Sequence, residues 1–330
     1  MRLLAVARKT AGWLVVAGLA GWGAAAIRFC APGPVALRWV LAFGYLVGII
    51  LLFALPKSRL RRWLGAAGLF GMVLGWWLAI PPANDRDWLP DVAVLPYAEI
   101  DGDRITVHNI RNCDYRTETD FDVRHYAATF DLSQLRTVDL FLCYWGSRPI
   151  AHTMMSFGFA DGRYLCFSVE TRKERGEQYS ALRGFFKQYE LTYVVGDERD
   201  LVRLRTNYRH EDVYCYRLKA PVPMIRAVLL DYLRCINALR DRPEWYNALT
   251  SNCTTNIRGH TKPYAQNSRW DWRLLANGYV DEMMYDRGVV DQRFSFGELR
   301  ERSRINERAQ RANNAVDFSQ RIRQGLPAPD

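Results

Sequence analysis

The chain has 330 residues, of which 49% are hydrophobic, and a net charge of +10. This composition excludes wholesale disorder and allows one or two domains. Nine of the 45 Lys and Arg residues lie in residues 1–80, which contain no Asp or Glu, and the remaining 36 are balanced by 35 acidic residues. Because the basic excess belongs to an apolar N-terminal segment, no nucleic-acid partner is expected.

The N-terminal segment contains three apolar runs, at residues 11–27, 39–55 and 63–80. Each is about 17 or 18 residues long, the lower end of the length that spans a membrane. A cleaved signal peptide would account for the first run only. A soluble helical hairpin is the alternative, but the second and third runs lack a polar face. We therefore predict a membrane anchor of three transmembrane helices in residues 1–80.

The basic residues of this anchor suggest its orientation. They lie mainly before the first run and in the second connection, with two more beside the first connection: Arg2, Arg8, Lys9, Lys57, Arg59, Arg61 and Arg62, then Arg28 and Arg38. The positive-inside bias places the N-terminus and the second connection in the cytoplasm. Three spans would then leave residues 81–330 in the periplasm, as part of a multi-pass protein of a bacterial inner membrane.

The rest of the chain is typical of an α+β domain. A proline-bearing linker is predicted at residues 81–96, a folded domain at 97–290, and a charged helix or loose tail at 291–330. Strand patterns occur at residues 98–109, 126–132, 137–144, 150–172, 191–195 and 212–218, and helix patterns at 223–239, 253–259 and 272–285. We therefore expect an antiparallel sheet packed with helices.

Seven cysteines are scattered through the chain without a CxxC pair. This spacing argues against a zinc ribbon or a thioredoxin-like motif, and most of the cysteines are expected to be buried apolar residues. The sequence shows neither a glycine-rich phosphate loop nor a His/Asp cluster. We therefore expect no metal, nucleotide or other cofactor.

The segment at residues 246–260, YNALTSNCTTNIRGH, suggests a reactive thiol. Asn252 is a favourable N-cap, which would make Cys253 the first residue of a helix. The positive end of the helix dipole would lower the pKa of the thiol there, and the backbone N–H of Cys253 could bind an oxyanion. Asn252, Thr254 or Thr255 could add a side-chain donor. The alternative is a polar capping sequence with an incidental cysteine.

A cysteine nucleophile needs a base, and the chain has five histidines. His260 follows Cys253 by seven residues, which is about 10 Å along a helix and too far for contact. His152 opens a strand among apolar residues, and its face carries Ser156 and Gly158. Either His152 is the base or it is a satisfied core histidine.

The turn of the hairpin at residues 150–172 decides what faces His152. A two-residue turn would place it opposite Thr171. A three-residue loop at residues 160–162, with Gly162 in a left-handed conformation, would place it opposite Glu170. We favour the second register because it brings both polar residues to one face and gives the histidine an orienting carboxylate.

A charge-rich stretch follows the hairpin, at residues 172–209. Arginines there, Arg172 and Arg205 in particular, are candidates for binding phospholipid headgroups. The alternative is a solvated face with ion pairs.

Several blocks match a known family in the same order: HTMMSFGF (152–159), FSVETRKERGEQYS (167–180), FFKQYELTYVVGDERDLVRLRTNYR (185–209) and WYNALTSNCTTNIRGH (245–260). They resemble the Lnb-type periplasmic domain family, and the resemblance includes residues 111–122 and extends to about residue 290. The family is similar to circularly permuted papain-like thiol enzymes, in which the histidine strand precedes the cysteine helix. His152 and Cys253 follow that order.

The resemblance implies acyl transfer from a membrane phospholipid to the N-terminal amine of a lipoprotein. Cys253 would form the thioester, His152 would take the thiol proton and later that of the amine, and Glu170 would orient His152. Two alternatives remain open. One is a periplasmic cysteine hydrolase, such as a cell-wall peptidase, an amidase or a lipase. The other is a non-catalytic envelope scaffold that binds lipid or lipoprotein.

Overall fold

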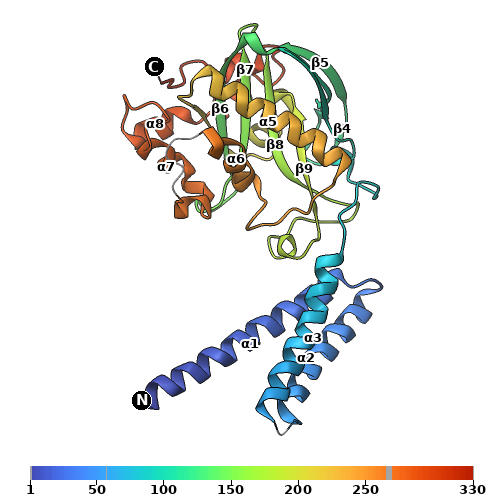
Figure 1. Ribbon diagram of the computed structural model, residues 1–330. Helices are drawn as coiled ribbons and strands as arrows, with labels where there is room; N and C mark the ends of the chain where they lie inside the picture. The colour runs from blue at the N-terminus through green and yellow to red at the C-terminus, as the bar shows by residue number, and fades with distance from the viewer. Residues whose placement is uncertain (1, 57, 265–269, 330) are drawn as a thin grey trace. The chain divides into compact units, whose positions relative to one another are not determined.

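The computed structural model describes residues 2–56, 58–264 and 270–329. The chain forms two compact units (Figure 1). The first contains Met1–Ala83 and Tyr179–Gln188, and the second contains Asn84–Gln178 and Tyr189–Asp330. The linker predicted at residues 81–96 therefore belongs mostly to the second unit.

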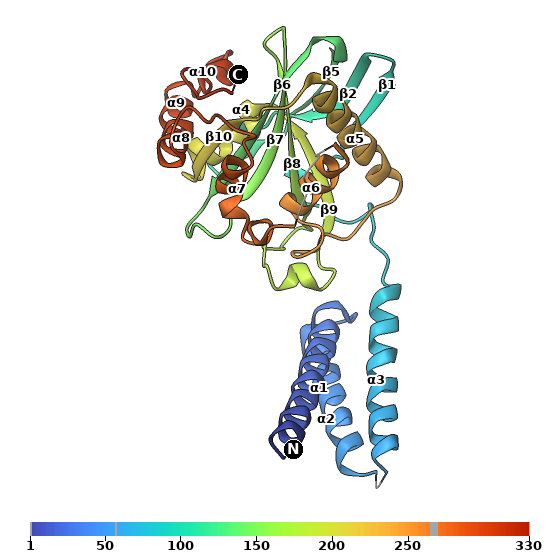
Figure 2. The ribbon, with the colours of Figure 1, turned by 60° about the vertical axis from the view of Figure 1, so that its left-hand side comes forward.

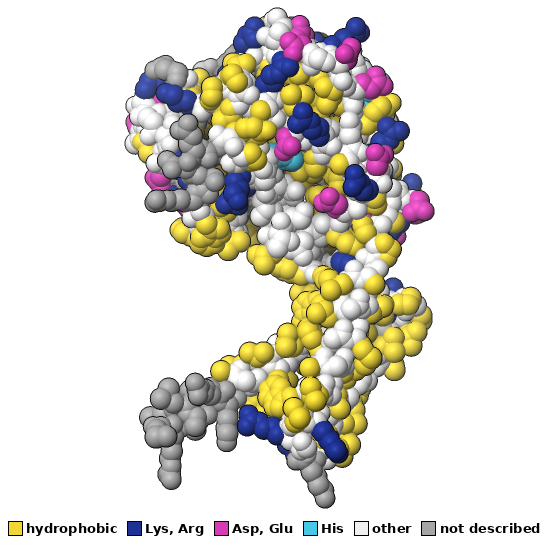
Figure 3. Space-filling view, in the orientation of Figure 1, with side chains coloured by type: hydrophobic (Ala, Val, Ile, Leu, Met, Phe, Trp, Pro, Cys, Tyr) yellow, Lys and Arg dark blue, Asp and Glu magenta, His cyan; other side chains and the backbone are white. Residues whose placement is uncertain are grey.

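The first unit is built on three helices: α1 (Arg2–Cys30), α2 (Val35–Ala54) and α3 (Arg59–Ala79). Their surface is largely hydrophobic, whereas both signs of charge are scattered over the second unit (Figure 3). Among the described residues, α1 over Thr10–Cys30 and α2 are the helices long and apolar enough to cross a membrane, judged by length and composition.

The prediction of a third span is wrong by this criterion, although residues 63–80 do lie mostly in a helix. Helix α3 begins with arginines and is interrupted by residues less apolar than the aliphatic side chains of α2: Arg59, Arg61, Arg62, Trp63, Gly65, Gly68, Gly71, Gly75, Trp76 and Trp77. The periplasmic location of residues 81–330 was predicted from a cytoplasmic N-terminus followed by three spans. With two spans, the charge pattern no longer predicts that location.

The insertion Tyr179–Gln188 packs within the helical unit. The Phe186 ring stacks on Phe29 with centroids 5.3 Å apart. The Lys187 ammonium donates hydrogen bonds to the backbone oxygens of Trp77, Leu78 and Ile80, at 2.9, 3.1 and 3.1 Å. Lys187 thus donates to three backbone carbonyls at the C-terminal end of α3, where a cation is favourable.

The second unit is an α+β fold, as predicted, around an eight-stranded sheet in the described part of the chain. The order is β1-β2-β9-β8-β7-β6-β10, and β5 pairs with β2. The strands are β1 (Tyr97–Asp101), β2 (Arg104–Arg111), β5 (His125–Asp131), β6 (Leu135–Tyr144), β7 (His152–Phe159), β8 (Tyr164–Arg172), β9 (Glu190–Gly196) and β10 (Asp212–Arg217). Strands β6 to β9 form an antiparallel meander. A separate ribbon pairs β3 (Asp114–Tyr115) with β4 (Phe121–Asp122).

Helices cover both faces of this sheet (Figures 1 and 2). One face packs on α5 (Val222–Asp241) and α6 (Cys253–Thr261), and the other on α4 (Glu198–Arg203), α9 (Asn306–Arg311) and α10 (Phe318–Arg321). The short helix η4 (Leu204–Tyr208) follows α4 directly. The helical spacing of apolar residues predicted α5, and these residues are buried there: Ile225, Leu229, Leu233 and Ile236. They pack with the sheet residues Phe157 and Phe167 in one core.

The end of the chain is more ordered than the loose helix or tail that its sequence suggests. It forms α8 (Phe296–Ser303), α9 and α10, with Ile305, Phe318 and Ile322 fully buried. The Arg323 guanidinium pairs with the buried carboxylates of Asp139 and Glu198, at 2.8 and 2.6 Å. These helices are too short to produce a clear apolar period in the sequence.

The helix predicted over residues 272–285 is broken into η6 (Trp272–Leu274), η7 (Asn277–Tyr279) and α7 (Val280–Asp286). The break lies where Gly278 passes against the loop before β7. A Cβ at Gly278 would lie 1.6 Å from the backbone oxygen of Arg148, so only glycine fits there. This close approach brings Asn277 beside the start of β7.

Candidate thiol active site

Cys253 is the first residue of helix α6, as predicted, and Asn252 is its N-cap. The Asn252 Oδ1 accepts a hydrogen bond from the Thr255 backbone N–H at 3.0 Å, and Thr255 Oγ1 accepts one from the Asn252 N–H at 2.8 Å. Asn252 Nδ2 also donates to the Ala248 carbonyl at 2.9 Å. Its side chain thus holds the turn through both its oxygen and one of its two amide N–H groups.

His152 begins β7, and the hairpin has the register favoured above. Met154 pairs with Ser168, and the same antiparallel register, continued by two residues, places His152 opposite Glu170. The connection is a three-residue loop closed by Phe159 and Arg163, in which Gly162 has a φ of +82°. The two-residue turn, with Thr171 opposite His152, is therefore excluded.

Cys253 and His152 interact electrostatically, and this interaction changes the pKa of both groups. Burial raises the pKa of the Cys253 thiol, but His152 and Thr153 lower it more, to about 7. Burial and Arg205 lower the pKa of His152, but Glu170 and Cys253 raise it to about 9. Between these values the pair can exist as thiolate and imidazolium, the reactive form of a cysteine nucleophile.

Ser168 links His152 to Glu170, and sequence reasoning missed it. Its hydroxyl donates to Glu170 Oε1 at 2.6 Å and contacts His152 Nε2 at 2.7 Å, while Nε2 itself lies 3.3 Å from Oε1. Because the single hydroxyl proton goes to the carboxylate, the serine oxygen must accept from an Nε2–H. Nδ1 of a neutral His152 is then the acceptor available for the thiol proton.

Glu170 is held as a carboxylate by its surroundings. Burial raises its pKa, but His152, Arg205 and Ser168 outweigh this and hold the pKa well below its usual range. Arg205 Nη2 lies 2.9 Å from Glu170 Oε1, and Nη1 lies 3.4 Å from Glu211. Arg205 is thus a buried member of the network behind the histidine, which contradicts its predicted role in binding headgroups.

Arg172 is also placed differently from its prediction. It is 2% exposed and lies over the Trp88 ring, with its guanidinium 4.3 Å from the ring centroid. Its nitrogens donate to the backbone oxygens of Val92 and Ala93 and to Asn84 Oδ1. Arg172 therefore fastens the segment before β1 to the domain, and it has no surface for a phospholipid.

Asn277 joins the strand that carries His152 to the helix that carries Cys253. Its Oδ1 accepts from the Ala151 N–H at 2.9 Å, and its Nδ2 donates to the Ala151 carbonyl at 2.6 Å and to Thr254 Oγ1 at 2.8 Å. The same Nδ2 lies 3.8 Å from Cys253 Sγ. Thr254 thus joins the Asn277 amide next to Cys253, whereas no feature of the sequence identified Asn277.

His260 takes no part in this site, as its distance along the helix predicted. Its Nδ1 lies 2.6 Å from Asp231 Oδ2 and its Nε2 lies 2.8 Å from the Tyr193 hydroxyl, so both ring nitrogens have partners. Burial lowers its pKa despite Asp231, which leaves a neutral ring bridging α6 to α5.

The pKa values predict how Cys253 reacts with a small neutral alkylating reagent. Labelling by iodoacetamide, followed by peptide mass spectrometry, should rise with pH around a midpoint near 7, because the thiolate forms there. His152→Ala should move this midpoint upward, since burial then dominates. Cys235, whose pKa burial raises to about 11, provides the internal reference. A midpoint unaffected by His152→Ala would contradict the pairing.

The fold and the site together define a class of thiol site, in which a cysteine begins a helix and a histidine begins an adjoining antiparallel strand. Residues 122–278 match the family described as the Lnb N-terminal periplasmic domain, so this part of the chain belongs to that family, as the resemblance predicted. The matched region contains His152, Glu170, Cys253 and Asn277. Comparisons with curated proteins and with solved structures gave no match.

Proposed function

We propose that this protein is a membrane-attached thiol acyltransferase that moves an acyl chain from a phospholipid to the N-terminal amine of a lipoprotein. The observation that carries the proposal is the contact between Cys253 and His152, with Ser168 and Glu170 behind the histidine. A non-catalytic scaffold has no need for a buried cysteine and histidine with opposed pKa shifts, which supports an enzyme instead.

The arrangement accounts for both halves of the reaction. In the first, Cys253 Sγ attacks the ester carbonyl, the ester C–O bond breaks, and the departing alcohol takes a proton from protonated His152. In the second, the amine attacks the thioester, His152 accepts the amine proton, and the C–S bond breaks to return the thiolate. The Cys253 N–H lies in the first turn of α6, where helical N–H groups lack helical partners and can bind the oxyanion.

The apolar helices α1 and α2 support a substrate that lies in a membrane. Both the acyl donor and the lipoprotein acceptor of the proposed reaction are lipids of a bilayer. We further propose that the thiol domain faces the periplasm, in keeping with the family to which it belongs.

The proposed reaction is tested in a bacterial strain depleted of its own lipoprotein N-acyltransferase. Expression of the full chain should restore N-acylated lipoprotein N-termini, read by mass spectrometry, and Cys253→Ala should not. N-acylation that survives Cys253→Ala would refute the mechanism. Release of free fatty acid without N-acylation would identify water as the acceptor and favour the hydrolase.

The periplasmic location gives a separate prediction. A reporter enzyme that is active only in the periplasm, fused after residue 90, should be active. Residue 90 belongs to the second unit, which contains Cys253 and which we propose faces the periplasm. A reporter that is active only in the cytoplasm, fused at the same place, should be inactive. The reverse pattern would place Cys253 on the cytoplasmic side and remove lipoproteins as the acceptor.

A further inference from the structure

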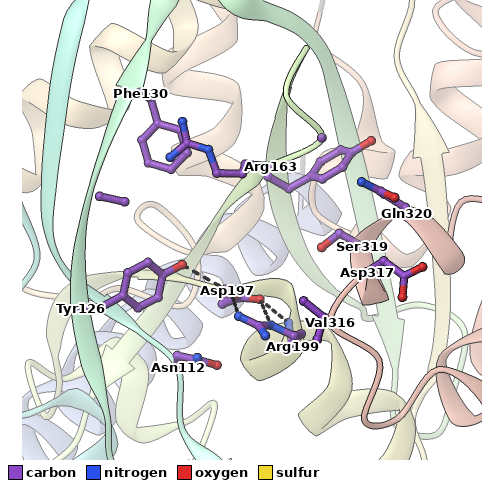
Figure 4. A pocket seen from close by; sticks show the side chains of 13 residues that line it. Asn112, Tyr126, Phe130, Arg163, Asp197, Arg199, Val316, Asp317, Ser319 and Gln320 are labelled. Atoms are coloured by element: carbon purple, nitrogen blue, oxygen red, sulfur yellow. Dashed lines mark hydrogen bonds and ion pairs between the residues drawn. The ribbon is translucent and has the colours of Figure 1, made fainter.

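A cavity lies in the second unit, the one that contains Cys253, and Cys253 is not among the residues that line it (Figure 4). Its volume is about 460 Å³, within the usual size range of small-molecule sites. Residues of β5, of the β7–β8 turn, of the start of α4 and of the α10 segment contribute to its walls. The turn is at the opposite end of β7 from His152, roughly 20 Å away for a strand of this length. The cavity is therefore separate from the candidate active site.

The charged side chains of this cavity are already paired with one another or with close neighbours. Arg199 makes two hydrogen bonds to Asp197, at 3.1 and 2.8 Å. Arg163 lies 2.7 Å from Asp161, and its Nη1 donates to the Thr129 carbonyl at 3.0 Å. An anionic or cationic ligand would have to break these pairs, so the cavity favours an uncharged ligand.

Neutral hydrogen-bonding groups, by contrast, remain available. Within the described residues no hydrogen bond is formed by the side chains of Asn112, Ser319 and Gln320 or by the Tyr164 hydroxyl, all of which line the cavity. Figure 4 shows Asn112 on one side and Ser319 and Gln320 on the other. Two amides and two hydroxyls offer both donors and acceptors from opposite walls.

An aromatic ring adds a flat apolar surface to these groups. Tyr126 is 37% exposed, and its hydroxyl is held by Asp197 at 3.3 Å, which fixes the ring at the cavity wall. Gly162 also lines the cavity and lies next to Gln320, because a Cβ added at Gly162 would lie 2.5 Å from Gln320 Nε2. The absence of a side chain at Gly162 leaves room for this amide.

We propose that the cavity binds a neutral saccharide. A sugar ring presents hydroxyl groups at its edge, which match the free amides and hydroxyls, and an apolar C–H face, which matches the Tyr126 ring. It carries no charge, in agreement with the paired arginines. The proposal concerns binding alone and does not depend on the reaction at Cys253.

The test uses the full chain in lipid nanodiscs, free of glycoside detergents. Saturation-transfer NMR with cellobiose, maltose and diacetylchitobiose should show transfer to ring protons of at least one disaccharide. Asn112→Ala and Gln320→Ala should each weaken its Kd about fivefold, as expected for one lost hydrogen bond. Gln324→Ala, on an exposed neighbouring glutamine that does not line the cavity, should leave the Kd unchanged.

Three results would overturn the proposal. They are the absence of transfer to all three disaccharides at millimolar concentration, transfer unchanged in an Asn112→Ala/Gln320→Ala double variant that remains folded by thermal unfolding, and displacement of the sugar by inorganic phosphate. Cys253→Ala should bind as the wild type does, which separates this result from any failure of the proposed transferase.

Discussion

Cys253→Ala is expected to lower the rate of acyl transfer by about a thousandfold or more, because the thioester can form on no other atom of the site. The rate is measured with the full chain in phospholipid vesicles that contain a fluorescent acyl donor. The wild type should accumulate an acyl adduct on the Cys253 peptide when no amine is present, and hydroxylamine should remove this adduct. The variant should show neither adduct nor turnover.

Cys235→Ala is the matched control. Cys235 is a partly buried thiol on α5, and burial raises its pKa although Tyr193 lowers it in part. Its replacement should leave the adduct and the rate close to those of the wild type. An adduct on any other cysteine, or turnover by Cys253→Ala within tenfold of the wild type, would contradict a Cys253 nucleophile.

The same assay should show a plateau of kcat/KM between about pH 7 and 9 in the free enzyme. The lower limb reflects the thiolate of Cys253, which forms as the pH rises through about 7. The upper limb reflects His152, which loses its proton as the pH rises through about 9 and can then no longer protonate the leaving alcohol. Both values belong to the coupled pair.

Features set by neighbours in the sequence were predictable, and features set by distant contacts were not. The cap at Asn252 follows from local preference, and the three-residue loop fixes the register that brings Glu170 to His152. Ser168 was detectable in principle, as a polar residue two positions before Glu170 on the same face of an apolar strand. Asn277 lies 24 residues beyond Cys253 and meets it only through the fold.

The positions of Arg172 and Arg205 also could not be predicted from the sequence. A run of charges in the sequence is usually a solvated face, and composition could not distinguish that from buried ion pairs. In the structure Arg205 pairs with Glu170 behind His152, and Arg172 binds the segment before β1. The third apolar run misled for a different reason, because its glycines and tryptophans count as apolar by type but contribute little hydropathy.

Asn277→Ala should slow acylation of Cys253 by about a hundredfold while leaving the fold intact. Asn277 is a positioning residue: it holds Ala151, next to His152, and Thr254, next to Cys253, with one amide. Without Asn277, β7 and α6 are no longer held to each other beside His152 and Cys253. A displacement of about 1 Å between two reacting groups slows a reaction by about a hundredfold. Single-turnover formation of the acyl adduct measures the effect directly.

A general loss of stability must be separated from this effect, and Asn237 provides the control. Its amide binds both the N–H and the carbonyl of Ala98, each at 2.8 Å, in the same way as Asn277 binds Ala151, but on β1. Each substitution to alanine should lower the free energy of unfolding by about 1–3 kcal/mol, since both leave a backbone N–H and a carbonyl without their partners. Only Asn277→Ala should slow acylation.

The pH dependence of alkylation gives a second readout that a purely structural role would not change. Asn277→Ala should raise the midpoint for labelling of Cys253, because the thiolate loses the nearby Nδ2 donor and its fixed position beside His152. Asn237→Ala should keep the midpoint near 7. If the two variants lose stability equally and also acylate and label alike, Asn277 supports the fold and has no part in aligning Cys253 with His152.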